Sequence, residues 1–412
     1  MMRLLPALLT LCAALPATLA QADDAVIAKA LSATTVDERH QASAVLAAAN
    51  DAASTYALGS ILFFEALEGL ALGLNRHGFE SPRSMLLPLM RLPIPERAEP
   101  EPLTYEGLRE ILSAFREAMA EAAATLEKVP GHAEIGIEVD LGRLAIDLDG
   151  DGKLTGAESI AGIMAALQGP RGGMPPALVF RFDRADGYWL QGYANLLMAQ
   201  ADFWLAHDFR NAFDGSFHML FPRAGLPLQN DLVPAPGTEG AGGLVASEWR
   251  IADFISFIHL VNWPVIEPER RKRAREHILE MIRLSRENWK SIRAETDNDR
   301  EWLPGPQQSG AHALTGLEVG EEQVTAWHDT LQMAVDILEG RALVPHFRFA
   351  DRGIDMKRFF DEPQTFDLVL AITGPGIVPY LRSGRVLTAE EWNALTRRFG
   401  DRGILPFAIW FN

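Results

Sequence analysis

Cysteine is almost absent from this chain of 412 residues, which contains only Cys12. That residue lies in an apolar run, 4–19, which follows a single arginine and ends near the small residues Ala20 and Ala22. Such a run is typical of a secretory signal peptide, so we expect residues 1–22 to be removed. The mature chain then contains no cysteine and forms no disulfide, although export usually permits disulfides.

Two alternative interpretations of this N-terminal run are disfavoured by its residues. A lipoprotein signal carries a small residue before the acylated cysteine, whereas the bulky Leu11 precedes Cys12. A retained membrane anchor would need a longer run, uninterrupted by Pro6 and Pro16. We therefore expect an exported protein, periplasmic or secreted, whose stability rests on core burial and on any bound metal.

Basic residues are also few. The chain has 38 Lys and Arg against 55 Asp and Glu, a net charge of −17 that becomes −18 once the segment carrying Arg3 is removed. Such an acidic chain disfavours nucleic acid and anionic lipid as partners. Hydrophobic residues make up 48% of the sequence, which is enough for one large domain or two medium ones.

Familiar catalytic motifs are missing as well. The sequence has no Gly-x-Ser-x-Gly, His-Glu-x-x-His, Walker A or Gly-x-Gly-x-x-Gly pattern, although a dispersed triad escapes such a search. His207 with Asp208, and Asp214 with His218 at i, i+4 spacing, remain candidates for zinc binding or general-base catalysis. Isolated pairs of this kind are more often structural, so the sequence leans against an enzyme without excluding one.

Aromatic residues and histidines supply one further candidate. Trp302, Trp327 with His328, and His346 are compatible with a polar-aromatic pocket. A tryptophan at helical spacing is more often part of a core than of a ligand platform. We therefore assign Trp327 to the core.

One acidic segment, residues 147–158, carries oxygen donors at a regular spacing. It reads Asp-Leu-Asp-Gly-Asp-Gly-Lys-Leu-Thr-Gly-Ala-Glu, with acids at positions 1, 3, 5 and 12 and a threonine at position 9. Ca²⁺ takes roughly 6–8 oxygen ligands at about 2.3–2.6 Å, so a short loop must direct many carboxylates and carbonyls at one point. Gly152 at position 6 permits the sharp bend that turns the Lys153 carbonyl inward.

The segment resembles the calcium-binding loop of the EF-hand superfamily at each diagnostic position, including the apolar Leu154 at position 8. Asp-Gly dipeptides also form solvated turns, but a turn does not require this leucine or the glutamate at position 12. The resemblance implies a bound Ca²⁺, with the glutamate as a bidentate ligand. The implied ligands are Asp147, Asp149, Asp151, Lys153, Thr155 and Glu158.

The segments that flank this loop differ from those of an EF-hand. Before it, Ile135, Ile137, Val139 and Leu141 alternate with polar residues or glycine, which predicts a strand. After it, residues 158–167 have apolar residues at helical spacing. We expect a strand-loop-helix unit, and calmodulin-like opening is then in doubt because it requires two helices that swing apart.

A weaker copy of the loop follows 36 residues later. Asp183, Leu190 and Gly192 repeat three positions of the first loop, and alternating apolar residues again precede the aspartate. Positions 3, 5 and 12 of the copy are alanine or glycine, so 183–194 is predicted to be a degenerate second loop with a structural role. In the alternative interpretation, Asp183 and Asp186 cap a helix that begins near residue 188.

The most apolar internal stretch, 56–74, contains Glu65 and Glu68. A helix spanning a membrane here would have to bury both carboxylates at a cost of several kcal/mol. Apolar residues at i, i+4, i+7 and i+11 predict a buried amphipathic helix instead. We therefore expect no membrane span in the mature chain.

The rest of the chain is predicted to be mainly helical. Helical patterns cover 105–128, 188–207, 269–292 and 321–339, Thr388 with Glu391 predicts a capping box, and 366–372 and 404–411 are predicted strands. Prolines and glycines in 230–243 predict a loop or domain boundary. The expected fold is mainly α with short β pieces (α+β), a multi-helix globular scaffold carrying the calcium loop. The expected regions are the signal peptide 1–22, a helical region 23–130, the EF-hand-like unit 131–210 and a helix-rich region with short strands 211–412.

Basic residues crowd the start of the helix predicted over 269–292. They could form an anion site, but a solvated helix face is the usual explanation in an acidic protein, and we favour it. These residues are Arg270, Arg271, Lys272, Arg273 and Arg275.

Two functional classes remain. In the first, an exported calcium-binding protein uses the ion to stabilise a soluble, mainly helical domain with an interaction or structural role toward an unidentified protein partner. In the second, an exported hydrolase or solute-binding protein has a purely structural calcium site. A deep pocket lined by convergent His, Asp and Trp residues, away from the loop, would favour the second class.

Overall fold

The structure of the protein is a computed structural model. It describes residues 24–81, 92–168, 178–231, 252, 254–309, 311–312, 315–400 and 403–411. The predicted signal peptide lies outside the described residues, and so does all but the start of the predicted loop 230–243. The described part is mainly helical with short strands, which confirms the expected fold class.

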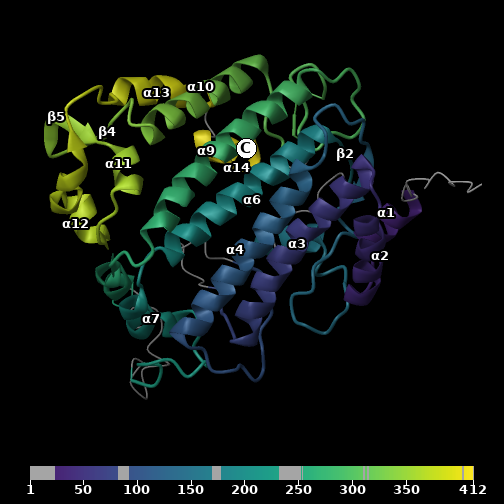
Figure 1. Cartoon of the computed structure of the whole chain (residues 1–412), viewed down its shortest axis with the longest axis horizontal. Helices are drawn as coiled ribbons and strands as arrows, with labels where there is room; N and C mark the ends of the chain where they lie inside the picture. The colour runs from purple at the N-terminus through teal and green to yellow at the C-terminus, as the bar shows by residue number, and fades with distance from the viewer. Residues whose placement is uncertain are drawn as a thin grey trace, which may run out of the picture.

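Four long helices form one layer (Figure 1). They are α3 (Ala52–Arg76), α4 (Tyr105–Glu127), α6 (Arg184–Leu205) and α9 (Pro268–Ile292), which lie side by side in that order, each packed on the next. All four cover stretches for which the sequence predicts helices. This layer is the scaffold on which the remaining elements are placed.

The starts of these helices follow from the residue types found there. Asp51 accepts a hydrogen bond from the Ser54 N–H at the start of α3, and Thr104 accepts one from the Gly107 N–H at the start of α4. Pro268 occupies the first turn of α9, where its missing N–H is not needed. Local capping and tertiary packing therefore favour the same boundaries.

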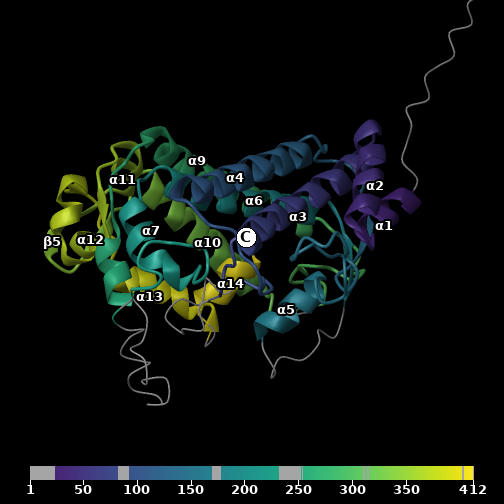
Figure 2. The ribbon, with the colours of Figure 1, turned by 90° about the horizontal axis from the view of Figure 1, so that it is seen from below.

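Shorter helices surround the layer. They are α1 (Asp24–Leu31), α2 (Val36–Ala48), α5 (Ile160–Gln168), α7 (Arg210–Ser216), α10 (Glu321–Leu338), α11 (Met356–Asp361), α12 (Leu368–Thr373), α13 (Ala389–Arg397) and α14 (Ile404–Trp410), with 3-10 turns η2 (Phe217–Met219) and η3 (Pro375–Tyr380). Figure 1 shows α1 and α2 at one end of the layer and α11 and α12 at the other. Figure 2 shows α5, α13 and α14 together on one side of it. The capping box predicted for Thr388 and Glu391 is present at the start of α13.

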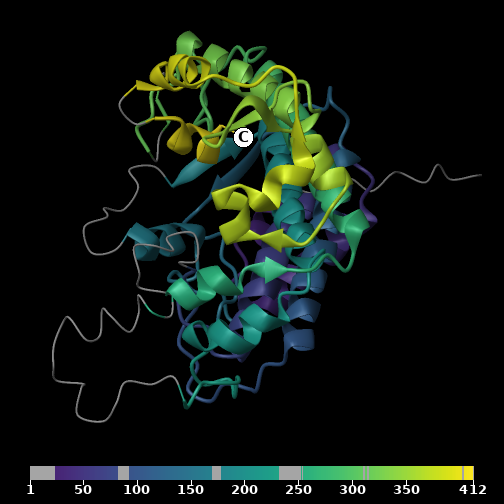
Figure 3. The same ribbon diagram turned by 90° about the vertical axis from the view of Figure 1, so that its left-hand side faces the viewer.

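The strands of the described residues form three small antiparallel sheets. They are β1 (Ile137–Asp140) with β2 (Val179–Phe182), β3 (Asn262–Trp263) with β6 (Phe366–Asp367), and β5 (Phe349–Ile354) between β4 (Val344–His346) and β7 (Leu381–Arg382). Figure 3 views the molecule from the end that carries the third sheet. The first sheet confirms the strand predicted ahead of the acidic loop.

One hydrophobic core connects the two ends of the described chain. It runs from Ile27 in α1 to Phe411 after α14, and it includes the fully buried Met119 of α4 and Trp289 of α9. The three regions predicted for the mature chain therefore share a core rather than having one each. The acidic loop is attached to this shared core through its flanking strand and helix.

Among the described helices, α3 alone is long and apolar enough to cross a membrane by length and composition. Half of its most apolar window is buried inside the protein, and core helices pass the same test. Its two carboxylates are paired with Arg39 of α2, which lies 3.1 Å from Glu65 and 2.6 Å from Glu68. Both carboxylates of this helix therefore have a guanidinium partner within the protein.

Two predicted strands are wrong. In 366–372 only the first two residues pair as a strand, because the Asp367 side chain caps α12 and starts a helix directly after it. Residues 404–411 form α14 and the residue after it, and this segment buries Phe407 and Phe411 in the core. Short apolar runs lack a clear period, so the sequence pattern did not distinguish a strand from a buried helix.

Candidate metal centre

The acidic segment 147–158 forms a loop between β1 and α5. The Ile146 N–H donates to the Glu158 carbonyl (3.2 Å), and the Ile160 N–H donates to the Leu144 carbonyl (2.9 Å). These two bonds hold the ends of the loop together, so its twelve residues turn back on themselves. The predicted strand-loop-helix arrangement is present, and no helix leads into the loop.

Asp147, at position 1, is buried and organises the first half of the loop. One carboxylate oxygen accepts from the N–H groups of Asp149 (3.2 Å) and Gly150 (2.7 Å), and the other accepts from the Gly152 N–H (3.0 Å). Gly150 and Gly152 have φ values of +82° and +76°, which side chains rarely tolerate. The sharp bend predicted at Gly152 is therefore present.

Glu158, at position 12, closes the loop from its other end and is also buried. Its Oε1 accepts from the Leu148 N–H (3.0 Å), and its Oε2 accepts from the N–H (3.1 Å) and the hydroxyl (2.7 Å) of Thr155. Both oxygens of this carboxylate thus point back into the loop. The position of this carboxylate is therefore fixed by hydrogen bonds from within the loop.

Three of the six predicted ligands come together. Asp147, Asp149 and Glu158 each offer a carboxylate oxygen, and these oxygens lie within 4.8 Å of one another. The side chains of Asp151 and Lys153 are exposed and pair with each other at 2.8 Å, a contact that lowers the pKa of the Asp151 carboxyl; the ligand predicted from Lys153 is its backbone carbonyl. The hydroxyl of the remaining side chain, at position 9, donates to the glutamate at position 12 rather than pointing away from it.

The middle of the loop is docked on the connection between α1 and α2. The Val36 N–H donates to the Gly152 carbonyl (3.0 Å), and the Leu154 N–H donates to the Thr34 carbonyl (2.9 Å). In paired EF-hands the residue at position 8 meets its counterpart from a second loop across such a short strand pairing. Here the backbone of residues 34–36 takes that place.

A glutamate of α3 is hydrogen-bonded to the first residue of the loop. Glu68 is buried and accepts a hydrogen bond from the Asp147 N–H (2.5 Å). Arg39 joins Glu68 to Glu65 and also donates to the Ala145 carbonyl (3.1 Å), just before the loop. Burial raises the pKa of the Glu65 carboxyl, and the neighbouring guanidinium opposes this. The first residue of the loop is therefore tied directly to α3, and the residue two positions before it is tied to α2.

Sequence reasoning missed this support. Glu68 and Arg39 lie 79 and 106 residues from their partners in the loop segment, and no local pattern marks such a contact. The available signal was the presence of two glutamates, Glu65 and Glu68, inside an otherwise apolar helix. A carboxylate in such a place needs a partner when it is buried, so it points to a contact elsewhere in the chain.

The predicted second loop, 183–194, is wrong, because α6 runs continuously from Arg184. Asp183 is the N-cap residue and accepts from the Ala185 N–H (2.7 Å), while Asp186 accepts from the Asp183 N–H (2.9 Å). The alternative interpretation, in which both aspartates cap a helix, is the observed one. The three residues shared with the first loop follow helical packing rather than a loop repeat.

A second group of carboxylates, distant in sequence, meets at this helix cap. Asp183, Glu295 and Glu301 offer oxygens within 4.8 Å of one another. Burial, with the neighbouring carboxylates, raises the pKa of Glu295 to about 8; burial raises that of Glu301 to about 7 and also raises that of Asp183. More than one hundred residues separate the first member from the other two, so no sequence spacing predicted the group.

The histidine candidates have structural surroundings. His207 is fully buried, and its Nδ1–H donates to the Phe203 carbonyl (2.6 Å), while burial lowers its pKa to about 4. Asp208 accepts from the Tyr105 hydroxyl (2.9 Å). Asp214 lies in α7, whereas His218 lies in the following η2, so one helix does not carry both.

The aromatic candidates do not form one pocket. Trp302 packs against Phe180 of β2, and Trp327 donates to the Ser285 hydroxyl (3.0 Å) inside the core, as expected for a core residue. His328 follows it on α10, and His346, in the third sheet, donates its Nε2–H to the Ile372 carbonyl (3.0 Å). Trp302 and Trp327 therefore both belong to the main hydrophobic core, whereas His346 lies in the third sheet.

The basic run at the start of α9 is not a solvated face. Arg271 has no exposed surface and donates to the Phe359 and Gln364 carbonyls. Arg275 is buried between Glu339 (3.0 Å) and Asp361 (3.1 Å). The expectation from charge patterning is wrong here because several of these arginines reach across to other elements of the fold.

Comparison with known proteins gives no match. No family model, curated protein or solved structure is significantly similar to the chain. What the protein does must therefore be inferred from the geometry of its own residues.

Proposed function

We propose that the protein is an exported calcium-binding protein in which the loop 147–158 holds Ca²⁺ and thereby stabilises a mainly helical domain. The observation that carries this proposal is the meeting of three carboxylate oxygens within 4.8 Å in a glycine-bent loop. Their residues occupy positions 1, 3 and 12 of a segment that resembles an EF-hand loop. The export rests on the N-terminal run of the sequence.

The donor set fits a hard cation. Asp147, Asp149 and Glu158 are oxygen donors without competing nitrogen or sulfur ligands, as Ca²⁺ prefers. The ammonium group of Lys153, within the loop, is exposed and pairs with Asp151. Mg²⁺ demands compact octahedral geometry and gives up water reluctantly, so a glutamate able to bind through both oxygens favours Ca²⁺.

The contacts of the loop indicate what bound calcium does. The loop backbone is hydrogen-bonded to residues 34–36, and Glu68 of α3 holds the N–H of its first ligand. An ion that orders the loop would also hold α2 and α3 in register with β1 and α5. Since the mature chain has no cysteine, calcium takes the stabilising role that disulfides have in many exported proteins.

A sensor mechanism of the calmodulin type finds no support in this geometry. Such a sensor opens when two helices flanking the loop swing apart. Here residues 144–146 enter the loop paired with residues 158–160, and only α5 leaves it as a helix. We therefore propose a structural rather than a switching role for the ion.

The hydrolase or solute-binding alternative lacks a supporting feature among the described residues. Two cavities of about 230 and 280 Å³ lie outside the loop. The first is lined mainly by apolar residues of α6 and α9, and the second lies beside Glu295. Neither is lined by a histidine, and the candidate histidines have structural partners.

Calorimetric titration of the mature protein with Ca²⁺ tests the proposal. We expect one strong site, weaker heat with Mg²⁺, and loss of the site in Glu158→Gln. Glu287→Gln, an exposed glutamate paired with Lys290 on α9, is the matched control and should bind like the unchanged protein. Two equivalent sites, or no heat at all, would contradict the proposal.

A further inference from the structure

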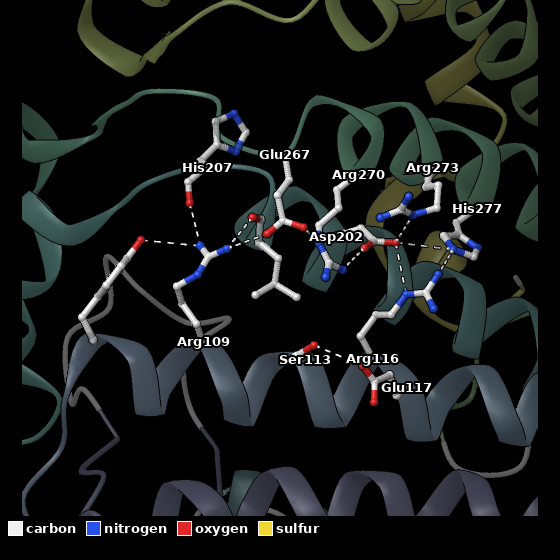
Figure 4. A network of polar contacts seen from close by, with 12 residues as sticks. Arg109, Ser113, Arg116, Glu117, Asp202, His207, Glu267, Arg270, Arg273 and His277 are labelled. Atoms are coloured by element: carbon white, nitrogen blue, oxygen red, sulfur yellow. Dashed lines mark hydrogen bonds and ion pairs between the residues drawn. The ribbon is translucent and has the colours of Figure 1, made fainter.

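A fully buried aspartate on α6 is surrounded by basic side chains of two neighbouring helices (Figure 4). Asp202 accepts from Arg270 Nη1 (2.7 Å) at one oxygen and from Arg116 Nε (3.2 Å) at the other. Arg273 Nε and His277 Nε2 approach that second oxygen at 3.7 and 3.6 Å. The side chains of α4 and α9 thus converge on one point of α6.

Cations outnumber carboxylates in this cluster. Glu267 is shared by Arg109 (2.9 Å) and Arg270 (2.7 Å). Four guanidinium groups therefore contact two carboxylates, while Glu106 and Glu276 lie near Arg109 and His277 without forming ion pairs with them. Glu117, next to Arg116 in sequence, accepts instead from a serine hydroxyl along α4 (3.3 Å). The cluster is a local basic site in a chain whose net charge is −17.

Few of the arginine N–H groups around Asp202 donate hydrogen bonds to its carboxylate. Among the described residues, Arg273 donates no hydrogen bond, and its side chain is 41% exposed. Arg116 directs Nε at Asp202 and Nη2 at His277 (3.3 Å), which leaves Nη1 without a protein acceptor in the same part of the chain. A guanidinium carries five N–H donors in a planar fork that matches two oxygens of an oxyanion.

His277 completes the cluster in its neutral form. Its Nδ1 lies 2.8 Å from the Asn195 amide oxygen and therefore carries the proton, so Nε2 accepts from Arg116. Burial lowers the pKa of His277, and the positive charge of Arg116 lowers it further, against the opposing pull of Asp202. An added anion beside these groups would favour the protonated ring.

We propose that Arg116 and Arg273, with His277 beside them, form a binding site for a tetrahedral dianion of the phosphate class. Asp202 holds the guanidinium groups in place, and the side chains of Arg116 and Arg273 are 21% and 41% exposed, so an acceptor from solution can reach them. Two guanidinium forks suit a doubly charged oxyanion better than a monovalent one, because each can donate a charge-assisted pair of hydrogen bonds. This site lies on α4 and α9 and is separate from the calcium loop.

Titration of the full mature protein with inorganic phosphate at low ionic strength tests the proposal. We expect saturable binding that weakens about tenfold or more in Arg273→Gln, since a hydrogen bond to a charged group contributes about 1.5–3 kcal/mol. Arg273 is partly exposed and has no direct hydrogen bond, so this variant should fold. Arg283→Gln, on the same helix and paired with Glu280, is the matched control and should bind phosphate unchanged.

Two further measurements make the result specific. Sulfate should compete with phosphate, whereas acetate at equal ionic strength should not. The pKa of His277, followed by its ring proton resonance, should rise when phosphate binds and should rise less in Arg273→Gln. Absence of saturable phosphate binding, equal binding by Arg273→Gln, or equal competition by acetate would each overturn the proposal.

Discussion

The described part of the chain contains two groups of three carboxylates, and the two differ in how the repulsion between their charges is reduced. In the loop, Asp147 and Glu158 each accept three hydrogen bonds, nearly all from backbone N–H groups of the loop itself. At the cap of α6, Asp183 and its neighbours Glu295 and Glu301 crowd one another in a half-buried place. The number of carboxylates is therefore not what distinguishes a calcium site.

The difference lies in what the surrounding chain offers the charged form. Backbone N–H groups pointing at a carboxylate favour its ionised state and fix its direction. Burial and like charges favour the protonated state, which is why the pKa of Glu295 rises to about 8 and that of Glu301 to about 7. Near neutral pH the three carboxyl groups at the cap of α6, the cap group, therefore reduce their mutual repulsion by binding protons. We propose that the carboxylates of the loop reduce theirs by binding Ca²⁺.

The sharpest test of this comparison removes one carboxylate from each group. Asp147→Ala should abolish calcium-dependent stabilisation, because it removes both a ligand and the acceptor for three loop N–H groups. A ligand present at 100 times its Kd stabilises the folded state by about 2.7 kcal/mol, so the unchanged protein should show a clear rise in Tm with calcium. Differential scanning calorimetry with and without calcium measures this.

Glu295→Gln is the counterpart in that experiment and should keep the full calcium-dependent rise in Tm. If it loses the rise as Asp147→Ala does, the cap group binds calcium and the contrast between the two groups fails. If calcium leaves the Tm of the unchanged protein unmoved but exposes a large dye-binding apolar surface, the protein is a sensor. The structural role proposed above would then be wrong.

The support beneath the loop gives the next largest effect. Glu68→Leu leaves the Asp147 N–H buried without its acceptor and Arg39 with one partner fewer. Losing a partner that orients a metal ligand typically costs about 10–100-fold in metal affinity, and we expect a loss in that range. Glu65→Leu is the control, since Glu65 touches Arg39 but not the loop. Equal losses from both changes would show a general effect of disturbing Arg39.

The pH dependence of stability separates the two groups without any metal. A carboxyl whose folded pKa is raised contributes stability that is present below its ordinary pKa, 4.5 for glutamate, and is lost as the pH rises through about 8. In chelator, the protein should therefore lose stability between pH 5 and pH 8.5. Glu295→Gln should lessen that loss by raising stability at pH 8.5 while changing little at pH 5.

Denaturant unfolding at the two pH values measures this, with Glu287→Gln as the exposed control. A Glu295→Gln variant that is equally destabilised at pH 5 and pH 8.5 would mean that Glu295 is ionised and stabilising throughout. The cap group would then resemble the loop. The raised pKa of Glu295 is the physical basis for treating the two groups of carboxylates as different.

Local signals predicted most of the scaffold. Long apolar stripes gave the helices of the layer, and alternating residues gave β1 ahead of the loop. The loop backbone was also predictable, because the bend at Gly152 and the placement of Glu158 follow from residue types at fixed positions. Short apolar runs such as 404–411 were wrongly taken as strands, because a few residues cannot establish a period.

Contacts between distant segments were beyond the sequence pattern. Glu68 supports the loop from 79 residues away, and Asp202 gathers arginines from two other helices. The arginines at the start of α9 were interpreted as a solvated face, because a run of charged residues in the sequence does not show which other elements their side chains contact. The supposed repeat at Asp183 was three matches at the start of a helix, where a capping box explains the aspartate better.

The smallest expected effect concerns two predicted ligands of the loop, at positions 9 and 12. Thr155 occupies position 9, which reaches the ion directly or through a water, and its hydroxyl donates to Glu158 at 2.7 Å. Thr155→Ala should therefore weaken calcium binding less than Glu158→Gln, which removes a charge and a bidentate ligand. Thr155→Ser keeps the hydroxyl and should bind nearly as the unchanged protein does. Calorimetric titration of the three variants ranks them, and equal losses from Thr155→Ala and Glu158→Gln would show that position 12 is not the principal ligand.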